Sequence, residues 1–451
     1  MSVPSTTTAD PLGSLRAEAS RHARRRVIIT IGALLAALAY FAASFVSFDI
    51  ASIAKRWSPD RALLFMLDTY AYKDHVEMKW DEPGVFEVSF EGGYRNIYET
   101  PPEWVTIDPA ADTADVSFPN GGHVIITPTM VEMRDWPNGE DFTFGLNTDG
   151  KPRVVSGGEI PDWIRITDNK VEVRPSLYER IQIYRSKVEV HRYEVGWGYF
   201  WFDFDSPLAG VGFFEAVKLM FSPDRIDPDR SNASLIMTEF WQNDLWHHGA
   251  VLFALVETLL MALLGTMIAC LVGLPLAFMA ARNITPFAPL RFILRRLFDF
   301  LRGIDILIWS LIFLRAFGPG LFTGIFAIAF TDTGTMGKLM SEALENADNK
   351  QREGVASTGA TRIQQHRFGM IPQILPVFIS QSLYYLESNT RSAVIIGAMG
   401  AGGIGLQFLG ALQTGSDFEN VAYMALLVLA LVILMDTLSG ALRRALIGYE
   451  R

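Results

Sequence analysis

The chain has 451 residues, of which 50% are hydrophobic and 20% are charged, and its formal net charge is −10. The apolar residues are concentrated in blocks: segments 27–48 and 258–281 contain 22 and 24 consecutive residues without a charged side chain. Each block is long enough to cross a hydrocarbon core of about 30 Å as a helix. The sequence therefore excludes a soluble enzyme and an intrinsically disordered chain.

The charge is divided unevenly along the chain. Residues 49–248 carry 34 acidic and 19 basic side chains, a net charge of −15, whereas the remaining 251 residues carry 15 and 20, a net charge of +5. An acidic region repels nucleic acid, so we expect no nucleic-acid partner. The single cysteine, Cys270, lies inside an apolar block, which rules out a disulfide within the chain and a cysteine-based metal site.

Residues 1–26 form a tail that ends in Arg24, Arg25 and Arg26, directly before the apolar block 27–48. A secretory signal peptide, with cleavage near 42–44, is one interpretation of this arrangement. Its apolar region would normally contain about 7–15 residues. Since this block is longer, an uncleaved transmembrane helix is favoured.

Residues 49–200 differ in pattern from the rest. Apolar and polar residues alternate in 85–90, 170–174 and 187–193, which is the period of half-buried strands. We predict a mainly antiparallel β domain inserted after the first span. A connector at 201–248 is rich in aromatic residues, which collect at membrane interfaces; the cluster at 197–204 fits the core of the β domain equally well.

Further apolar spans are predicted at 250–281, 304–317, 319–334, 371–397 and 420–440. With the first block they make about six transmembrane helices, although the short pair at 304–334 also fits one re-entrant hairpin. The predicted fold class is a polytopic α-helical membrane protein, with its permease-like core in 249–451, that carries an inserted mainly-β domain.

Basic residues predict the orientation in the membrane. Lysine and arginine cluster in 1–26, 282–302, 338–367 and 443–451, and such clusters remain in the cytoplasm. Six spans place all four segments on that side. Both termini are then cytoplasmic, and region 49–248 is periplasmic.

A polar loop at 345–370 separates the fourth and fifth spans. It contains Glu353, Ala356, Gly359 and Ala360, and Pro372 follows thirteen residues after the glycine. We predict a short helix, a bend that glycine permits, and a second helix that begins at Pro372. The spacing resembles the cytoplasmic coupling loop of ATP-binding-cassette (ABC) importer permeases, with Gly354 where that family often has alanine. An unspecialised basic loop is the alternative.

Further segments narrow the resemblance, and they include residues 221–224, before the second span, and 274–283, at its end. Together with residues 257–266, 384–391 and 400–405, these segments look like the permease of phosphonate importers. The likeness covers the first span and about residues 205–451 but not the β insert. It implies a chain in the bacterial inner membrane that translocates phosphonate or a related phosphorus oxyanion. It also implies ATPase subunits that bind ATP and magnesium and dock on the 345–370 loop, a periplasmic phosphonate-binding protein, and a second permease subunit, identical or different.

The chain is not expected to be an enzyme. Around Gly337 and Lys338 a phosphate-binding loop would need a glycine at the position of Asp332 and serine or threonine at that of Leu339. ATP hydrolysis and its cofactors therefore belong to a partner. The seven histidines are scattered without ligand spacing, so no metal site is predicted.

One predicted span carries a polar stripe formed by Ser380, Tyr384, Glu387 and Arg391. These side chains share a helix face and should line a translocation pathway, because an ionisable group that faces lipid costs at least about 2.5 kcal/mol. A structural ion pair between Glu387 and Arg391 is the alternative. Arg315 and Glu257 are further pathway candidates; the first could instead extend to the membrane interface, and the second could serve in packing.

A glycine-rich segment follows the stripe and contains Gly397, Gly400, Gly402, Gly403 and Gly405. Part of it matches a dinucleotide-binding pattern, but it follows a membrane helix and not a strand, so that function is rejected. We predict an outer gate, since glycine tolerates backbone rearrangement and close approach.

Two other functions remain open. The chain could be a permease for another small solute such as methionine. It could also be a membrane-anchored sensor or assembly protein that works through its outer β domain. If it is a permease for anions, the acidic insert would repel the cargo, so we predict that the insert is a docking or structural element.

Overall fold

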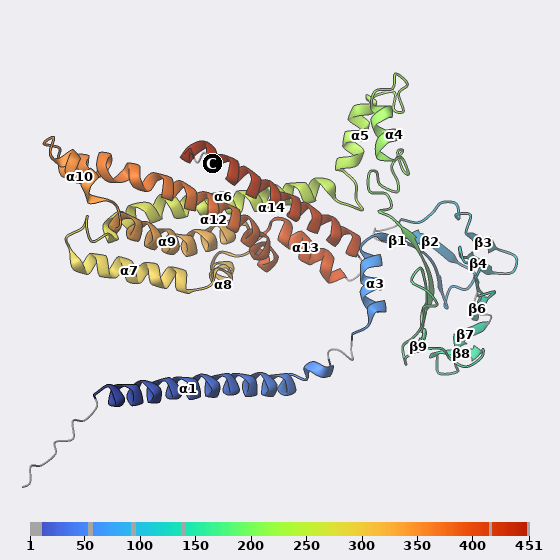
Figure 1. Ribbon diagram of the computed structural model, residues 1–451. Helices are drawn as coiled ribbons and strands as arrows, with labels where there is room; N and C mark the ends of the chain where they lie inside the picture. The colour runs from blue at the N-terminus through green and yellow to red at the C-terminus, as the bar shows by residue number, and fades with distance from the viewer. Residues whose placement is uncertain (1–10, 53–56, 92–95, 137–140, 415–416, 449–451) are drawn as a thin grey trace, which may run out of the picture. The chain divides into compact units, whose positions relative to one another are not determined.

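The computed structural model describes residues 11–52, 57–91, 96–136, 141–414 and 417–448 (Figure 1). The chain divides into two compact units, Met1–Phe65 and Met66–Arg451. Part of the predicted tail 1–26 and the last residues of the segment 443–451 lie outside the described residues.

The first unit contains α1 (Pro11–Ser47) and most of α3 (Pro59–Asp68). Within α1, Arg21–Ser47 forms 27 residues with a mean hydropathy of 2.2. At 1.5 Å per residue this stretch is about 40 Å long, which exceeds the thickness of a hydrocarbon core. The apolar side chains of this stretch are exposed. The prediction of a helix over 27–48 is confirmed.

The second unit begins with a sandwich of two six-stranded antiparallel sheets (Figure 1). One sheet has the order β2-β1-β12-β11-β10-β9 and the other β3-β4-β5-β6-β7-β8, so the second sheet is a meander inserted between β2 and β9. The strands are β1 (Ala71–Lys79), β2 (Phe86–Phe90), β3 (Val105–Asp108), β4 (Thr113–Ser117), β5 (His123–Ile126), β6 (Met130–Arg134), β7 (Phe142–Leu146), β8 (Pro152–Ser156), β9 (Ile164–Ile166), β10 (Lys170–Val173), β11 (Glu179–Tyr184) and β12 (Lys187–Val195).

Alternating side chains from both sheets form the core of the sandwich. Val76 and Met78 of β1, Val188 and Val190 of β12, and Phe144 of β7 are completely buried in one cluster. The two-residue period places their polar neighbours on the opposite faces. The predicted mainly-β insert is therefore present, and the three alternating segments predicted as strands are β2, β10 and β12.

A short helical hairpin follows the sandwich. It consists of α4 (Phe213–Met220) and α5 (Asn232–Trp241), which pack through Ala216, Leu235 and Ile236. The sequence patterns predicted only an aromatic connector here. These helices are eight and ten residues long, too short for their periodicity to be distinguished from that of a loop.

The remaining helices form the apolar bundle. They are α6 (His248–Ala280), α7 (Ala288–Gly303), α8 (Ile306–Phe317), α9 (Leu321–Glu345), α10 (Asn349–Ala356), α11 (Arg362–Gln365), the π-helical turns η1 (His366–Met370) and η2 (Gly397–Ala401), α12 (Ile371–Ile396), α13 (Gly403–Thr414) and α14 (Phe418–Ile447). Among the described residues, Arg21–Ser47, α6 and α14 are long and apolar enough to cross a membrane, and the bent pair Arg362–Ala401 and Gly403–Thr414 would make a fourth span.

The segments predicted as the third and fourth spans are unequal. Helix α8 has only 12 residues and is about 18 Å long, which is less than a hydrocarbon core. Helix α9 has 25 residues and continues to Glu345, well beyond the predicted end at 334. Lys338 on this extension contacts Asp299 of α7, with 2.7 Å between Nζ and Oδ1. A total of six spans therefore stays a prediction.

The aromatic cluster at 197–204 packs within the second unit against the first turns of α6 and α14. Trp197 and Phe200 contact Trp246 and Tyr423, and the ring of His248 lies between the Phe200 carbonyl oxygen, 2.6 Å away, and the Tyr423 hydroxyl, 2.9 Å away. The cluster thus joins the β insert to the helical bundle.

Candidate functional site

The 345–370 loop folds as a helix, a bend and a short second helix. Asp348 caps α10 by accepting a hydrogen bond from the Lys350 amide, and α10 ends shortly before Gly359, whose φ is +80°. Thr361 and Gln364 form a capping box at the start of α11. The predicted short helix and glycine bend are confirmed, and α12 begins at Ile371, one residue before Pro372.

The outer surface of this loop is exposed and partly apolar. Ile363 and Phe368 are 80% and 60% exposed, and a groove of about 690 Å³ runs past Val355, Gly359 and Ala360. Glu353 and Ala356 lie on α10, which buries none of its residues. An exposed apolar groove on a polar loop is a surface that a partner protein can cover.

The loop is attached firmly to the start of α12. The Gln373 side chain accepts a hydrogen bond from the Asp348 amide at 2.9 Å and donates one to the Gly369 carbonyl oxygen. A Cβ atom on Gly369 would lie 2.9 Å from the Cα atom of Arg352. This close backbone contact joins α10 to η1, which leads directly into α12.

The polar stripe of α12 is more exposed than a buried helix face would be. Tyr384 is 53% exposed and Arg391 is also exposed, whereas Ser380 and Glu387 are half-buried. Glu387 and Arg391 lie on one face as predicted, yet within the described part of the chain no ion pair joins them. An unpaired arginine that faces lipid is unfavourable, so we expect this face to contact water or another protein.

Glu257 lies beside the glycine-rich segment. Its carboxylate accepts a hydrogen bond from the Gly403 amide at 3.2 Å, and the neighbouring Thr258 hydroxyl accepts one from the Ile404 amide at 2.9 Å. Both amides belong to the first turn of α13, where backbone N–H groups lack helical partners. The structure thus brings a predicted pathway residue and a predicted gate residue together, with Glu257 in a capping role.

The glycines of this segment permit very close backbone contacts. A Cβ atom on Gly405 would lie 1.9 Å from the Val394 carbonyl oxygen, and one on Gly397 would lie 2.4 Å from the Gly402 carbonyl oxygen. Gly400, Gly402 and Gly403 have φ values of +110°, +90° and +69°, a region that other residues rarely adopt. The chain can therefore fold back tightly between α12 and α13.

Gly400 also contacts the turn between α8 and α9. Its carbonyl oxygen accepts a hydrogen bond from the Gly320 amide at 3.2 Å, and a Cβ atom there would lie 3.2 Å from Leu314. Arg315, the next residue, is exposed. The glycine-rich segment is therefore held on one side by α6 and on the other by the α8–α9 turn.

The sequence patterns missed a polar cluster buried between α6, α9 and α12. Asn389 of α12 donates hydrogen bonds to Asp332 of α9 and to Thr266 of α6, and all three are at most 5% exposed. Nearby, the Cys270 thiol donates to the Ser382 hydroxyl at 3.2 Å. Asp332 is the one acidic residue in the predicted span 319–334, but its partner Asn389 is 57 residues away in sequence.

No group of three or more histidine, cysteine, aspartate or glutamate side chains that could hold a metal ion occurs among the described residues.

Comparison with known proteins assigns part of the helical region to a family. Residues 273–448 match the family described as binding-protein-dependent transport system inner membrane component. The phosphate-import permease protein PhnE of Mycolicibacterium smegmatis is 36% identical over 196 residues, which cover 44% of this chain and 37% of that protein. This chain thus spans much less than two thirds of that relative's length.

Two shorter relatives are covered more fully. The phosphite transport system permease protein PtxC of Stutzerimonas stutzeri is 37% identical over 190 residues, 42% of this chain and 69% of that protein. The putative cryptic phosphonate transport system permease protein PhnE2 of Escherichia coli K12 is 40% identical over 118 residues, 26% of this chain and 96% of that protein.

Among solved structures, the methionine ABC transporter MetNI matches 44% of this chain and 96% of the solved chain at 22% identity with a TM-score of 0.40, a similarity too low to support an argument about substrate. The sequence relatives, with more than 30% identity over more than two thirds of their length, decide the family. The chain belongs to the inner-membrane components of binding-protein-dependent transport systems, the permease subunits of ABC importers.

Proposed function

We propose that this chain is the pore-forming subunit of an importer for phosphonate or a related phosphorus oxyanion. The observation that carries the proposal is the identity of 34–40% with permeases named for phosphite and phosphonate, each covered over more than two thirds of its length. Methionine import and a sensing or assembly role have no comparable support in sequence.

The energy comes from a partner. Two ATPase subunits bind ATP and magnesium and dock on the 345–370 loops of two permease subunits, against the groove beside Val355 and Phe368. A soluble periplasmic binding protein delivers the cargo. The second permease subunit is a copy of this chain or a shorter relative, and it covers the exposed polar face of α12.

The pathway follows Ser380, Tyr384, Glu387 and Arg391. Since no ion pair joins Arg391 to Glu387 in the part of the chain that the structure describes, the Arg391 guanidinium retains donors for an oxyanion, which it can bind in a bidentate manner. Arg315 adds a positive charge to the α8–α9 turn. Glu257 does not contact the cargo in this proposal; it holds the first turn of α13.

ATP-driven closure moves α10 and the start of α12 as one body, because Gly369 and Gln373 join them. The far end of α12 then shifts against the α8–α9 turn, and Gly397, Gly400, Gly402, Gly403 and Gly405 absorb the change in backbone direction. Both termini lie in the cytoplasm in this arrangement, and the β insert lies in the periplasm.

Uptake by intact cells tests the substrate. Cells that lack this chain should lose uptake of labelled ethylphosphonate or phosphite, and plasmid-borne chain should restore it, while methionine uptake stays unchanged. The variant Arg391→Gln should reduce uptake of the oxyanion severalfold and leave the abundance of the complex unchanged. Restored methionine uptake without oxyanion uptake would overturn the proposal.

Association with the ATPase tests the coupling role. Gly359→Asp places a charge and a side chain at the open groove and strains the left-handed backbone, so ATPase association and transport should be lost. Gly354→Ala is the matched control, because a Cβ atom at that position meets nothing within 4 Å. Intact transport in the Gly359→Asp variant would refute the assignment of the loop.

A further inference from the structure

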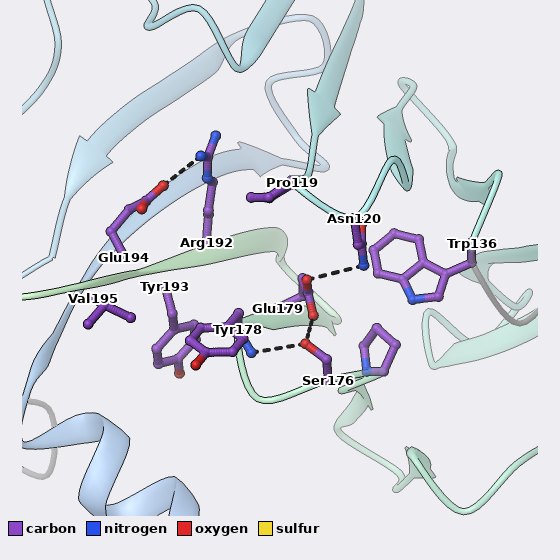
Figure 2. A pocket seen from close by; sticks show the side chains of 11 residues that line it. Pro119, Asn120, Trp136, Ser176, Tyr178, Glu179, Arg192, Tyr193, Glu194 and Val195 are labelled. Carbon is purple, nitrogen blue, oxygen red and sulfur yellow. Dashed lines mark hydrogen bonds and ion pairs between the residues drawn. The ribbon is translucent and has the colours of Figure 1, made fainter.

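The β insert contains a cavity that the transport function does not use. It has a volume of about 720 Å³ and lies where the β10–β11 loop and the end of β12 meet the turn between β4 and β5. Figure 2 shows the carboxylate of Glu179 between Asn120 and Ser176, with Trp136 on one side and Tyr178 and Tyr193 on the other. This volume is in the range of small-molecule sites, about 300–1,000 Å³.

Glu179 is the group that defines the chemistry of this cavity. It is only 4% exposed, and its two oxygens accept hydrogen bonds from Asn120 Nδ2, at 3.2 Å, and from the Ser176 hydroxyl. No lysine, arginine or histidine among the described residues forms an ion pair with it. Burial therefore raises the pKa of the Glu179 carboxyl group, and a carboxylate with a buried, uncompensated charge is unfavourable.

The arginine opposite Glu179 in the sheet forms its contacts elsewhere. Arg192 is the cross-strand neighbour of Glu179, but its guanidinium contacts Glu194 and lies over the Trp104 ring, 5.4 Å from the ring centre. The cavity is thus lined by two carboxylates and one guanidinium, a net charge of −1. With the acidic surroundings of region 49–248, this sign repels an oxyanion.

Aromatic rings surround the same carboxylate. Tyr178 lines the cavity and is 44% exposed, so part of its side chain is available to a ligand. Tyr193 is already in contact with cations, because Lys73 Nζ and Arg174 lie 5.6 and 5.7 Å from its ring centre. A ring beside a carboxylate attracts a positively charged group through the electrons of its face.

We propose that this cavity binds a small organic cation, with its ammonium group between the carboxylate of Glu179 and the ring of Tyr178. The ligand supplies the positive charge that the buried carboxylate lacks, and Trp136 and the two prolines of the cavity wall pack against its carbon atoms. The site is separate from the pathway for the oxyanion, and the proposal does not depend on the cargo.

The test is a titration of the purified full chain in nanodiscs with n-butylammonium and with ethylphosphonate, followed by calorimetry. Butylammonium should bind and ethylphosphonate should not. Glu179→Gln should weaken butylammonium binding by about tenfold or more, because the neutral amide cannot pair with the cation. Glu159→Gln, an exposed glutamate outside the cavity, is the matched control and should bind as the parent does.

Tyr178 provides a second test that does not disturb the buried carboxylate. Tyr178→Leu should weaken binding severalfold, and Tyr178→Phe should restore it, because phenylalanine keeps the ring that contacts the cation. Binding of butylammonium should also weaken as the pH falls and Glu179 becomes protonated. Equal binding in the parent and Glu179→Gln, or tighter binding of ethylphosphonate than of butylammonium, would overturn the proposal.

A third probe, 2-aminoethylphosphonate, carries an ammonium group and a phosphonate group on one molecule. It should bind more weakly than butylammonium, because the acidic cavity repels the phosphonate end. Tighter binding than butylammonium would contradict a site that excludes oxyanions.

Discussion

At the scale of single residues, the glycines at the junction of α12 and α13 have different roles. Gly400, Gly402 and Gly403 are needed for their positive φ values, whereas Gly405 lies in a helix and is needed because no side chain fits. Its Cβ position is 1.9 Å from the Val394 carbonyl oxygen and 2.6 Å from the Ala398 nitrogen. Backbone atoms cannot yield as a flexible side chain can.

We predict that Gly405→Ala lowers the stability of the bundle by about 1–3 kcal/mol, which is typical of an overpacked core. Gly410→Ala in the same helix should leave it unchanged or raise it slightly, because a Cβ atom there meets nothing within 4 Å and alanine favours helix. The melting temperatures of both variants in detergent measure the difference. Equal melting temperatures would show that the backbone at Gly405 is looser than described.

These residue-level features differ in how far the sequence could reveal them. The run of glycines between two apolar segments predicted a tight, bent backbone, and the positive φ values agree. The partner of Glu257 could not be predicted, since Gly403 lies 146 residues further along the chain. Asn389 was equally hidden, because a lone amide on a membrane helix has no periodic signal to mark its contacts with α6 and α9.

At the scale of elements, the outer face of the β1–β12 pair is a dense array of charges. His191 lies between Glu91 and Glu189, with nitrogen–oxygen distances of 3.7 and 3.5 Å. Burial opposes ionisation of both carboxyl groups, but His191, with Lys73 near Glu91 and Lys187 near Glu189, lowers the pKa of each to about 2. Burial likewise opposes the charge of His191, and the two glutamates raise its pKa.

The signs of these shifts predict how the stability of the insert depends on pH. Carboxyl groups with a lowered pKa contribute stability above their unfolded value, about 4.5, and lose it as the pH falls toward 2. The raised pKa of His191 contributes stability below about 6.5 that is lost as the pH rises through the folded value. His75, 5.2 Å from the His191 ring, has a pKa lowered first by burial and then by His191, so its protonation in acid opposes folding.

We therefore expect amide exchange in β1 and β12, corrected for intrinsic rates, to accelerate steeply as the pH falls from about 4.5 toward 2. The variant His191→Gln removes the positive partner of both glutamates, so its loss of protection over this range should be shallower. Exchange mass spectrometry on peptides from the two strands provides the measurement. An unchanged slope in the variant would show that the histidine does not stabilise the carboxylates.

The short helix α11 depends on its cap. Thr361 accepts a hydrogen bond from the Gln364 amide while the Gln364 side chain accepts one from the Thr361 amide at 2.8 Å. Thr361→Ala should cost about 1 kcal/mol, so the four-residue helix should fray and ATP-driven uptake should fall severalfold. Because the loop is exposed, the melting temperature of the bundle should hardly change. Thr361→Ser keeps the hydroxyl and should restore uptake; if it does not, the cap is not the cause.

Elements were easiest to predict where periodicity is strong. The alternating segments became β2, β10 and β12, and the long apolar blocks became α1, α6, α12 and α14. The pairing of strands could not be predicted, because the second sheet is inserted whole between β2 and β9. The amphipathic helix α7 was predicted only as a basic segment, because arginines dominate its sequence. Its apolar face was missed, although Phe298 on that face packs against Gly337 of α9.

At the scale of the whole molecule, a regular ABC permease region carries an acidic insert that the family model, residues 273–448, does not include. The sign of the charge separates the two parts: the insert has −15 and the rest +5. That division predicts opposite sides of the membrane for the insert and the 345–370 loop. Between the insert and this loop lie three predicted spans, or one span if 304–334 is a re-entrant hairpin. An odd number of spans places the two regions on opposite sides in either case.

The single cysteine makes this arrangement measurable. Cys270→Ser keeps the hydrogen bond to Ser382 and provides a cysteine-free chain in which one exposed residue at a time becomes cysteine. A membrane-impermeant maleimide added to intact spheroplasts should label Asp149→Cys in the insert, and it should label Lys350→Cys in α10 only after permeabilisation. Labelling of both from outside would contradict the predicted orientation.

Labelling at Pro319 tests the number of spans. Labelling at Asp149 and Lys350 cannot test it. The exposed residue Pro319 lies in the turn between α8 and α9. If both helices cross the membrane, Pro319→Cys should be labelled from outside, as Asp149→Cys is. If they form a hairpin that enters from the cytoplasm, Pro319→Cys should not be labelled from outside.

Helix α8 is only about 18 Å long, so only α9 is long enough to cross the whole membrane. In a full crossing, the α8–α9 turn and Arg315 would lie near the outer surface. We therefore expect labelling from outside at a lower rate than for Asp149→Cys, since the turn contacts Gly400.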